Sequence, residues 1–185
     1  RSSRTDETLG PVYGKQWRDF NGVDQLYNLV YSIITNPDSR RLMVSAWAPH
    51  EMNDMVLPPC HYAFQVYINN GVIDLMWQQR SADVFLGLPY DIAMYGLLLE
   101  MLAKGADLRA GQLIGQLGDC HLYNNHLQQA KQYRLRSKRA LPKLQLERGI
   151  NANLLGGVNI PDASEIKLLK YNPYPAIKAE LSVGK

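Results

Sequence analysis

A β-hairpin pattern followed by a long helix pattern constrains the fold of this chain more than any other feature. Residues 62–68 and 72–79 have strand patterns, and Asn69-Asn70-Gly71 between them is typical of a tight hairpin turn. Apolar residues then recur at helical spacing between Ile92 and Leu102. The sequence therefore predicts two paired strands that lead into a largely buried helix.

Shorter patterns account for the rest of the chain, with residues 48–59 expected to form a loop. Several strands with a few interspersed helices, and no regular alternation of strand and helix, indicate an α+β fold. Further helices are expected over residues 22–35 and 121–133, and further strands over residues 42–47, 112–117, 143–147 and 166–170.

Length and charge limit the class of protein. With 185 residues, 46% of them hydrophobic, the chain can bury one core, so residues 1–185 are expected to form a single domain. Neither a run of 18 apolar residues nor a signal peptide pattern is present. We expect a cytoplasmic protein without a membrane partner, in the host cytoplasm if the gene is viral. A net charge of +3 permits an anionic ligand, and no nucleic acid is expected.

The cysteines and histidines give no metal-binding pattern. The two cysteines, Cys60 and Cys120, are expected to be free thiols in a reducing compartment. No CxxC or HxxxH spacing occurs, so no metal site is predicted. Cys120 is expected to pack as a small apolar side chain, and the basic stretch 131–148 to form a solvated face.

The stretch from Gln79 to Asp91 has the composition of a functional site. An arginine, a serine and two aspartates interrupt an apolar run where a strand pattern changes to a helix pattern. Taken alone, Asp91 also suits a first-turn carboxylate that the helix dipole favours. Arg40 and Arg41 likewise have two interpretations, either solvated charges or forked donors for a phosphate.

Short motifs along nearly the whole chain resemble those of thymidylate synthases, in the same order and at similar separations. On these motifs the chain is identified as a member of the thymidylate synthase family. They occupy residues 9–18, 37–41, 59–61, 79–81, 83–89, 118–119, 121–123, 125–126 and 177–178.

The resemblance implies a large, bent mixed sheet flanked by helices, and a homodimer in which two such sheets pack back to back. It also implies transfer of a one-carbon unit from 5,10-methylenetetrahydrofolate, a co-substrate, to C5 of a pyrimidine nucleotide monophosphate. Compared with the family pattern, the sequence begins late, because a catalytic glutamate and a shielding tryptophan of the family would precede Arg1. It also runs past the usual C-terminus to Gly184 and Lys185.

The resemblance assigns roles to individual residues. Cys60 matches the thiol that adds to C6 of the pyrimidine, and Arg80 is the expected cationic neighbour that favours the thiolate. Tyr13 and His61 match members of the active-site hydrogen-bond network. Arg80, Ser81 and Gln79 match residues that contact the phosphate side and the base of the substrate. Arg40 and Arg41 match arginines that contact the phosphate bound by the partner subunit. His121 and Tyr123 match the ligands of the ribose 3′-hydroxyl, and Asp83 and Gly87 match contacts of the folate.

Asp91 departs from the family pattern and determines the expected substrate. Thymidylate synthases carry Asn here, whose amide donates to uracil O4 and accepts from N3–H. Cytosine inverts both partners, so a protonated Asp can donate to N3 and accept from N4, and an ionised Asp can pair with an N3-protonated ring. The same exchange distinguishes deoxycytidylate hydroxymethylases. We therefore expect conversion of dCMP to 5-hydroxymethyl-dCMP, with Asp91 both binding the base and assisting catalysis.

Other functions stay open. Within the same chemistry they are methylation of dUMP by a thymidylate synthase, methylation of dCMP, and hydroxymethylation of CMP. Outside it, a catalytically inactive module that binds nucleotides or RNA is the alternative. Two further departures from the family pattern are Gln78, where a tyrosine is usual, and Tyr174, where a histidine is usual.

Overall fold

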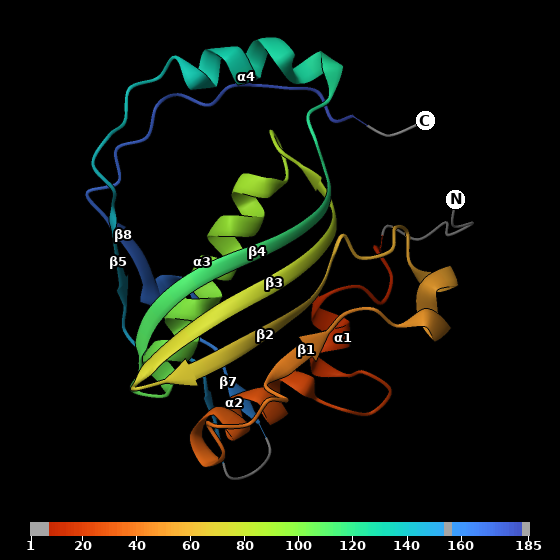
Figure 1. Cartoon of the computed structure of the whole chain (residues 1–185), viewed down its shortest axis with the longest axis vertical. Helices are drawn as coiled ribbons and strands as arrows, with labels where there is room; N and C mark the ends of the chain where they lie inside the picture. Colours follow the sequence, from red (N-terminus) through yellow and green to blue (C-terminus); the bar gives the residue numbers. More distant parts are fainter. Residues whose placement is uncertain (1–7, 154–156, 183–185) are drawn as a thin grey trace.

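The centre of the computed structural model, which describes residues 8–153 and 157–182, is a four-stranded mixed sheet (Figure 1). The sheet has the order β1–β2–β3–β4; the first two pairings are antiparallel and the third is parallel. Its strands are β1 (Met43–Ser45), β2 (His61–Asn69), β3 (Val72–Asp83) and β4 (Arg109–His121). The expected α+β class with a mixed sheet is confirmed.

Helices and two small sheets surround this centre. The helices are α1 (Gly14–Arg18), α2 (Gln25–Thr35), α3 (Leu88–Gly105) and α4 (Leu127–Arg134), with short 3₁₀ helices η1 (Pro49–Asp54), η2 (Asn124–His126) and η3 (Ala163–Glu165). The small antiparallel sheets pair β5 (Lys143–Leu146) with β8 (Ile166–Leu169), and β6 (Asn151–Ala152) with β7 (Val158–Asn159). Within residues 8–153 and 157–182, no helix has the length and apolar character needed to span a membrane.

The predicted hairpin is confirmed. β2 and β3 pair in antiparallel register up to Asn69 and Val72, which leaves a two-residue turn. Both turn residues have positive φ, 50° for Asn70 and 72° for Gly71. Asn and Gly are the residues that adopt this conformation at least cost, so the local sequence determines the register of the two strands.

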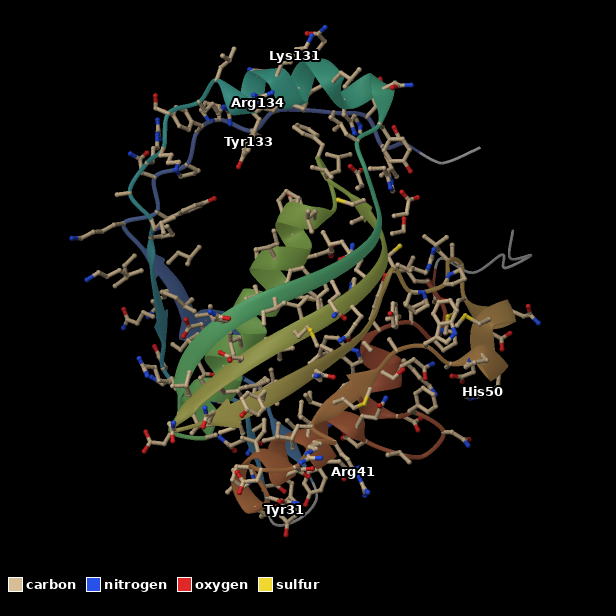
Figure 2. The ribbon with its side chains drawn as sticks, viewed as in Figure 1. Tyr31, Arg41, His50, Lys131, Tyr133 and Arg134 are labelled. Carbon is tan, nitrogen blue, oxygen red and sulfur yellow. The ribbon has the colours of Figure 1, made fainter. Side chains whose placement is uncertain are left out.

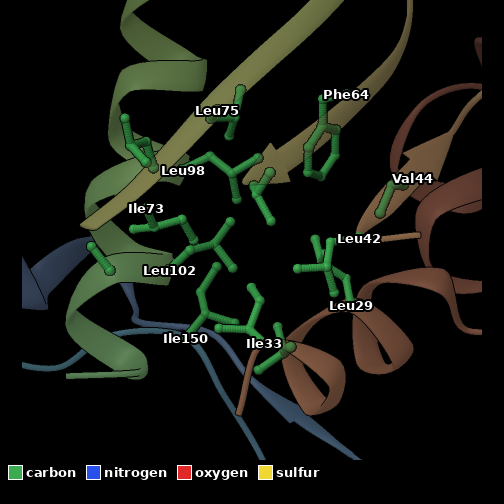
Figure 3. Packing of buried hydrophobic residues seen from close by; sticks show 14 of the residues in the cluster. Leu29, Ile33, Leu42, Val44, Phe64, Ile73, Leu75, Leu98, Leu102 and Ile150 are labelled. Carbon is green, nitrogen blue, oxygen red and sulfur yellow. The ribbon is translucent and has the colours of Figure 1, made fainter. Parts of the chain in front are cut away.

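One face of the sheet carries the core. Alternate residues of β3 are buried, among them Ile73, Leu75 and Trp77, and α2 and α3 pack over them (Figure 3). The predicted helices supply the matching apolar faces, with Leu29 of α2 and Leu102 of α3 both almost fully buried. The opposite face of the sheet has no such cover from the described residues.

A parallel crossover, β3–α3–β4, positions the cavity described below. The sequence patterns indicated no regular alternation of strand and helix, and this one unit is present within the mixed sheet. Parallel strands end at the same edge of a sheet. The ends of β3 and β4 and the start of α3 therefore meet at one place.

The region after α3 differs most from the sequence prediction. β4 is much longer than the expected strand 112–117, because Gly111, Gly115 and Gly118 weaken its pattern. The expected helix 121–133 begins only at Leu127, after the end of β4 and a 3₁₀ turn. The prediction that Cys120 packs inside is also wrong: it is exposed, because β4 is an edge strand.

Two arginines of the basic stretch hold the C-terminal segment against the segment that follows α4. Arg139 stacks over the Tyr174 ring at 3.7 Å and donates to the carbonyls of Asn172 and Pro173. Arg136 lies 5.2 Å from the same ring and donates to the carbonyl of Pro175. The stretch is exposed, as predicted, but these two cations fix the chain that runs beside α4 (Figure 1).

Gly115→Ala is expected to destabilise the protein. A Cβ at this position would lie 2.5 Å from the ring of Trp77, which is buried and stacked on Tyr95. Overpacking of this kind costs about 1–3 kcal/mol. Gly96→Ala is the control, because its Cβ would meet Leu113 at an ordinary 3.8 Å and alanine favours a helix. Urea unfolding should show a lower midpoint for Gly115→Ala alone; equal midpoints would contradict the packing described.

Candidate active site

A cavity of about 690 Å³ opens at the sheet edge where β3, β4 and α3 meet. It gathers every site residue predicted from the sequence except Arg40 and Arg41. Its lining consists of Tyr13, Leu57, Cys60, His61, Gln79, Arg80, Ser81, Asp83, Leu86, Gly87, Asp91, His121, Tyr123, Leu181 and Ser182.

Arg40 and Arg41 lie away from this cavity. They precede β1, and Figure 2 shows Arg41 at the α2 end of the molecule, far from the end of β3. Arg40 lines a separate surface hollow together with Asp38 and Ser39. Their predicted contact with the phosphate bound by a partner subunit stays a prediction.

Cys60 sits beside a fixed cation. The Arg80 guanidinium donates from Nε to the carbonyl of Pro59 at 2.9 Å and from Nη2 to the carbonyl of Pro58 at 2.8 Å. The same Nη2 lies 3.9 Å from Cys60 Sγ. The backbone N–H of Cys60 donates to Tyr13 Oη at 3.1 Å. The sulfur of Cys60 thus lies within reach of an anchored positive charge.

His61 is held between two tyrosines. Tyr13 stacks on its ring with centroids 4.1 Å apart, and Tyr13 has a strained positive φ of 31°. His61 Nδ1 is hydrogen-bonded to Tyr95 Oη at 2.9 Å. Burial lowers the pKa of His61, an effect that the nearby Asp91 partly opposes, and burial raises the pKa of both tyrosines.

The Asp91 carboxylate is oriented by Gln79. Trp77 Nε1, which can only donate, bonds to Gln79 Oε1 at 3.0 Å. The Gln79 amide nitrogen therefore faces the other way, where it donates to the carbonyl of Ser81 at 2.9 Å and to Asp91 Oδ2 at 2.8 Å. Asp91 Oδ1 is left 3.9 Å from His61 Nε2. Gln79 thus occupies one carboxylate oxygen, and the other lies on the side of His61.

A turn between β3 and α3 positions Asp83. Its Oδ1 accepts from the backbone N–H groups of Phe85 and Leu86, at 3.0 and 3.2 Å. The fully buried His126 lies behind it, with Nδ1 4.0 Å from Asp83 Oδ1. His126 Nε2 donates to the carbonyl of Glu180 at 2.8 Å. His126 is therefore structural and connects the turn to the C-terminal segment.

Sequence reasoning missed four residues that line the cavity, Leu57, Leu86, Leu181 and Ser182, and also Tyr95, which contacts His61. Leu181 and Ser182 line it from the C-terminal segment, where Ser182 Oγ also bonds to Asn125 Oδ1 at 2.7 Å. Tyr95 had only the signal of a core residue at helical spacing, and its hydroxyl contact with His61 could not be inferred from that spacing. The predicted extension to Gly184 and Lys185 lies outside the described residues.

His121 and Tyr123 reach the cavity from the end of β4. Their rings meet edge to face with centroids 4.8 Å apart, and His121 Nδ1 lies 3.3 Å from the carbonyl of Asp119. In the parallel pairing of the two strands His121 lies opposite Asp83, and both line the cavity together with Ser81 and Arg80. The cavity thus combines a thiol, a cation, hydroxyl groups and two carboxylates.

Comparison with known proteins identifies proteins with similar sequences. A family model described as thymidylate synthase matches residues 2–183. The chain is 48% identical over 177 residues to a thymidylate synthase of Mycoplasma mobile, and 45% identical over 177 residues to one of Mycoplasma pneumoniae; each match covers 95% of this chain and 59% of the relative. A thymidylate synthase of Coxiella burnetii is 47% identical over 180 residues, which cover 95% of this chain and 66% of that protein. The chain spans about three fifths to two thirds of the length of these curated relatives.

Proposed function

This chain belongs to the thymidylate synthase family, and on that premise we propose that it acts in transfer of a one-carbon unit from 5,10-methylenetetrahydrofolate to C5 of a pyrimidine nucleotide. The observation that carries the proposal is the Cys60 thiol, 3.9 Å from the Arg80 guanidinium in a cavity that also holds Asp91. Asp83 and Gly87 are the proposed folate contacts.

The residues suit covalent catalysis. A pyrimidine is too weak a nucleophile at C5 to take up a one-carbon unit directly. Addition of the Cys60 thiolate at C6 gives an enolate or enamine, whose C5 can attack the one-carbon unit. Loss of the C5 proton would expel the folate amine and leave an exocyclic methylene on the Cys60 adduct. Once that methylene has been captured, departure of the thiolate restores the ring. Arg80 and Ser81 would bind the phosphate, and His121 and Tyr123 the ribose 3′-hydroxyl.

A cytosine nucleotide is the proposed substrate, with 5-hydroxymethyl-dCMP as the product. Support comes from Asp91, whose Oδ2 accepts from Gln79 and whose Oδ1 is directed away from that amide. A carboxyl group can accept from the N4 amino group of cytosine while it shares a proton with N3. An ionised Asp91 would instead repel O4 of uracil. Water would then complete the reaction by adding to the exocyclic methylene.

Methylation of dUMP is the second candidate. It is favoured by the similar proteins reported above, which are thymidylate synthases at 45–48% identity. In that reaction a hydride from the folate reduces the exocyclic methylene, and no water adds to it. The two candidates share Cys60 and its covalent adduct, and they differ in the base and in the final step.

One measurement separates these candidates from each other and from a pure binding module. The full-length protein is incubated with folate and with 5-tritiated dCMP or dUMP. We expect tritium release from dCMP and a product with the mass of the hydroxymethyl nucleotide. Release from dUMP with a methyl product would support the second candidate. Nucleotide binding without release from either substrate would identify a binding module.

A homodimer is also proposed. The sheet face opposite the core exposes apolar side chains, with Met43 at 51%, Tyr67 at 62% and Ile114 at 41% of their full accessible surface. Back-to-back packing of two sheets would cover them. The same arrangement would let Arg40 and Arg41 of one subunit reach the phosphate bound by the other.

Mixing two inactive variants tests this arrangement. Arg40→Ala and Cys60→Ser subunits are expected to regain activity in heterodimers, because one of the two sites then has an intact Cys60 and an intact Arg40 from its partner. The assay is tritium release before and after the subunits are exchanged, with each variant alone as the control. No recovery in verified heterodimers would mean that Arg40 acts within its own subunit or has no part in the reaction.

A further inference from the structure

Tyr95 carries the most completely buried hydroxyl group near the cavity. The side chain has no exposed surface, and its ring stacks on Trp77 with centroids 5.4 Å apart and planes 14° apart. The ring edge also meets Phe64 at 5.9 Å. Packing against these two rings fixes the Tyr95 ring, so the direction of the hydroxyl group is set by the core of the protein.

This hydroxyl acts as a hydrogen-bond donor. Burial raises the pKa of Tyr95, and the nearby Asp91 and Tyr13 raise it further, so the phenol keeps its proton. In the part of the chain that the structure describes, its hydrogen-bond partner is His61 Nδ1, at 2.9 Å. If Nδ1 carried a proton, the buried hydroxyl would have to accept it and its own proton would lack a partner.

The proton of the neutral imidazole therefore belongs on the other ring nitrogen. We propose that Tyr95 is a positioning residue: it holds His61 in the Nε2–H tautomer, so that the imidazole presents an N–H donor to the cavity beside Asp91. The stack of Tyr13 on the ring face fixes the plane in which this donor lies. The assignment does not require the one-carbon transfer proposed above.

The position of this donor has a consequence for ligands. His61 Nε2 and Asp91 Oδ1 are 3.9 Å apart, too far for a direct hydrogen bond and close enough for one water or ligand atom to bridge them. Gln79 already donates to the other oxygen of Asp91. The edge of a bound base near Asp91 thus meets an N–H from His61, and a ligand acceptor or a bridging water suits that position.

Side-chain ¹⁵N–¹H correlation spectra of the uniformly labelled full chain test the tautomer without a substrate. The His61 signals are assigned by their loss in His61→Gln. We expect separate resonances for a protonated Nε2 and an unprotonated Nδ1 at neutral pH. A protonated Nδ1, or resonances averaged between the two tautomers, would overturn the proposal. This result is independent of whether the protein turns over a nucleotide.

Two tyrosine variants test whether the Tyr95 hydroxyl sets the tautomer of His61. Tyr95→Phe keeps the ring in the aromatic stack and removes only the bond to Nδ1, so the His61 resonances should move toward a mixture of tautomers. Tyr13→Phe is the matched control, since it keeps the stack on His61 and removes a hydroxyl that bonds to Cys60 instead. An unchanged tautomer in folded Tyr95→Phe would overturn the proposal; if this variant fails to fold, the wild-type spectrum decides alone.

The pKa of His61 gives a second readout. The titratable groups that face it are Asp91 and Tyr95 of α3 and Tyr13 before α1, with Cys60 and Arg80 lining the same cavity. The Tyr95 bond occupies the lone pair that protonation needs, so its loss should raise the His61 pKa, whereas Tyr13→Phe should change it less. A pKa that falls or stays constant in folded Tyr95→Phe would contradict the assigned direction of the bond.

Discussion

Cys60→Ser is expected to abolish turnover while nucleotide binding is largely retained. The serine hydroxyl is a much weaker nucleophile than a thiolate beside Arg80, and only the covalent step needs sulfur. The phosphate and ribose contacts proposed for Arg80, Ser81, His121 and Tyr123 are unchanged by the substitution. The measurements are tritium release from 5-tritiated dCMP and the Kd of the nucleotide.

The second cysteine supplies the control for this prediction. Cys120 is a free thiol on the exposed side of β4, and it does not line the cavity. Cys120→Ser should therefore keep the wild-type rate. If Cys60→Ser retained more than about a tenth of that rate, a barrier change of roughly 1.4 kcal/mol, the covalent mechanism would be wrong.

Asp91→Asn is expected to shift the preferred substrate from dCMP toward dUMP. Gln79 Nε2 must donate to residue 91, because the indole of Trp77 fixes the Gln79 amide. An asparagine would therefore turn its oxygen toward Gln79 and its amino group toward the side of His61. That arrangement offers a donor for uracil O4 and mispairs with the N4 amino group of cytosine.

The size of this shift follows from the two contacts that change, one at O4 or N4 of the base and one at N3. Each unpaired buried polar group costs about 1–3 kcal/mol, so two could change the ratio of kcat/KM values by roughly 30-fold to 10⁴-fold. Part of the effect should appear in kcat, because a proton on N3 stabilises charge that develops only when the thiolate adds. Steady-state kinetics with both nucleotides measures the shift.

Asp83→Asn is the matched control, since it removes a carboxylate from the same cavity at the proposed folate site. It should change the KM for folate and leave the preference between the two bases unaltered. If wild type already prefers dUMP, or if Asp91→Asn changes the preference by less than about threefold, under 1 kcal/mol, Asp91 does not select the base. Methylation of dUMP would then be the better-supported function.

Local chemistry explains which parts of the fold were predictable. Asn70 and Gly71 both need positive φ, and the apolar spacing within α3 is regular, so these elements follow from the nearby sequence. β4 was underestimated because its glycines, which allow close approach to Trp77 and to the backbone of Arg80, carry no strand signal. Its pairing with β3 depends on residues far away in the chain.

The candidate site also has parts that follow from the nearby sequence and parts that depend on contacts across the fold. Motifs near the ends of β3 and β4 identified most of the cavity lining, because each is a short run with its own chemistry. Contacts made across the fold left no local pattern. The bond from Tyr95 to His61, the link from Trp77 through Gln79 to Asp91, and the approach of Leu181 belong to this second group.

The parallel pairing of β3 with β4 also bears on how the protein folds. Val72 pairs with Arg109, so α3 and its connections must cross the sheet before the two strands can join. Contacts of this sequence separation form slowly because the chain must first close a long loop. The two halves of the cavity, with Ser81 on one strand and His121 on the other, exist together only after that step. A bound nucleotide can therefore stabilise only molecules in which β3 and β4 are already paired. Binding should slow the unfolding of these molecules and leave the rate of folding unchanged.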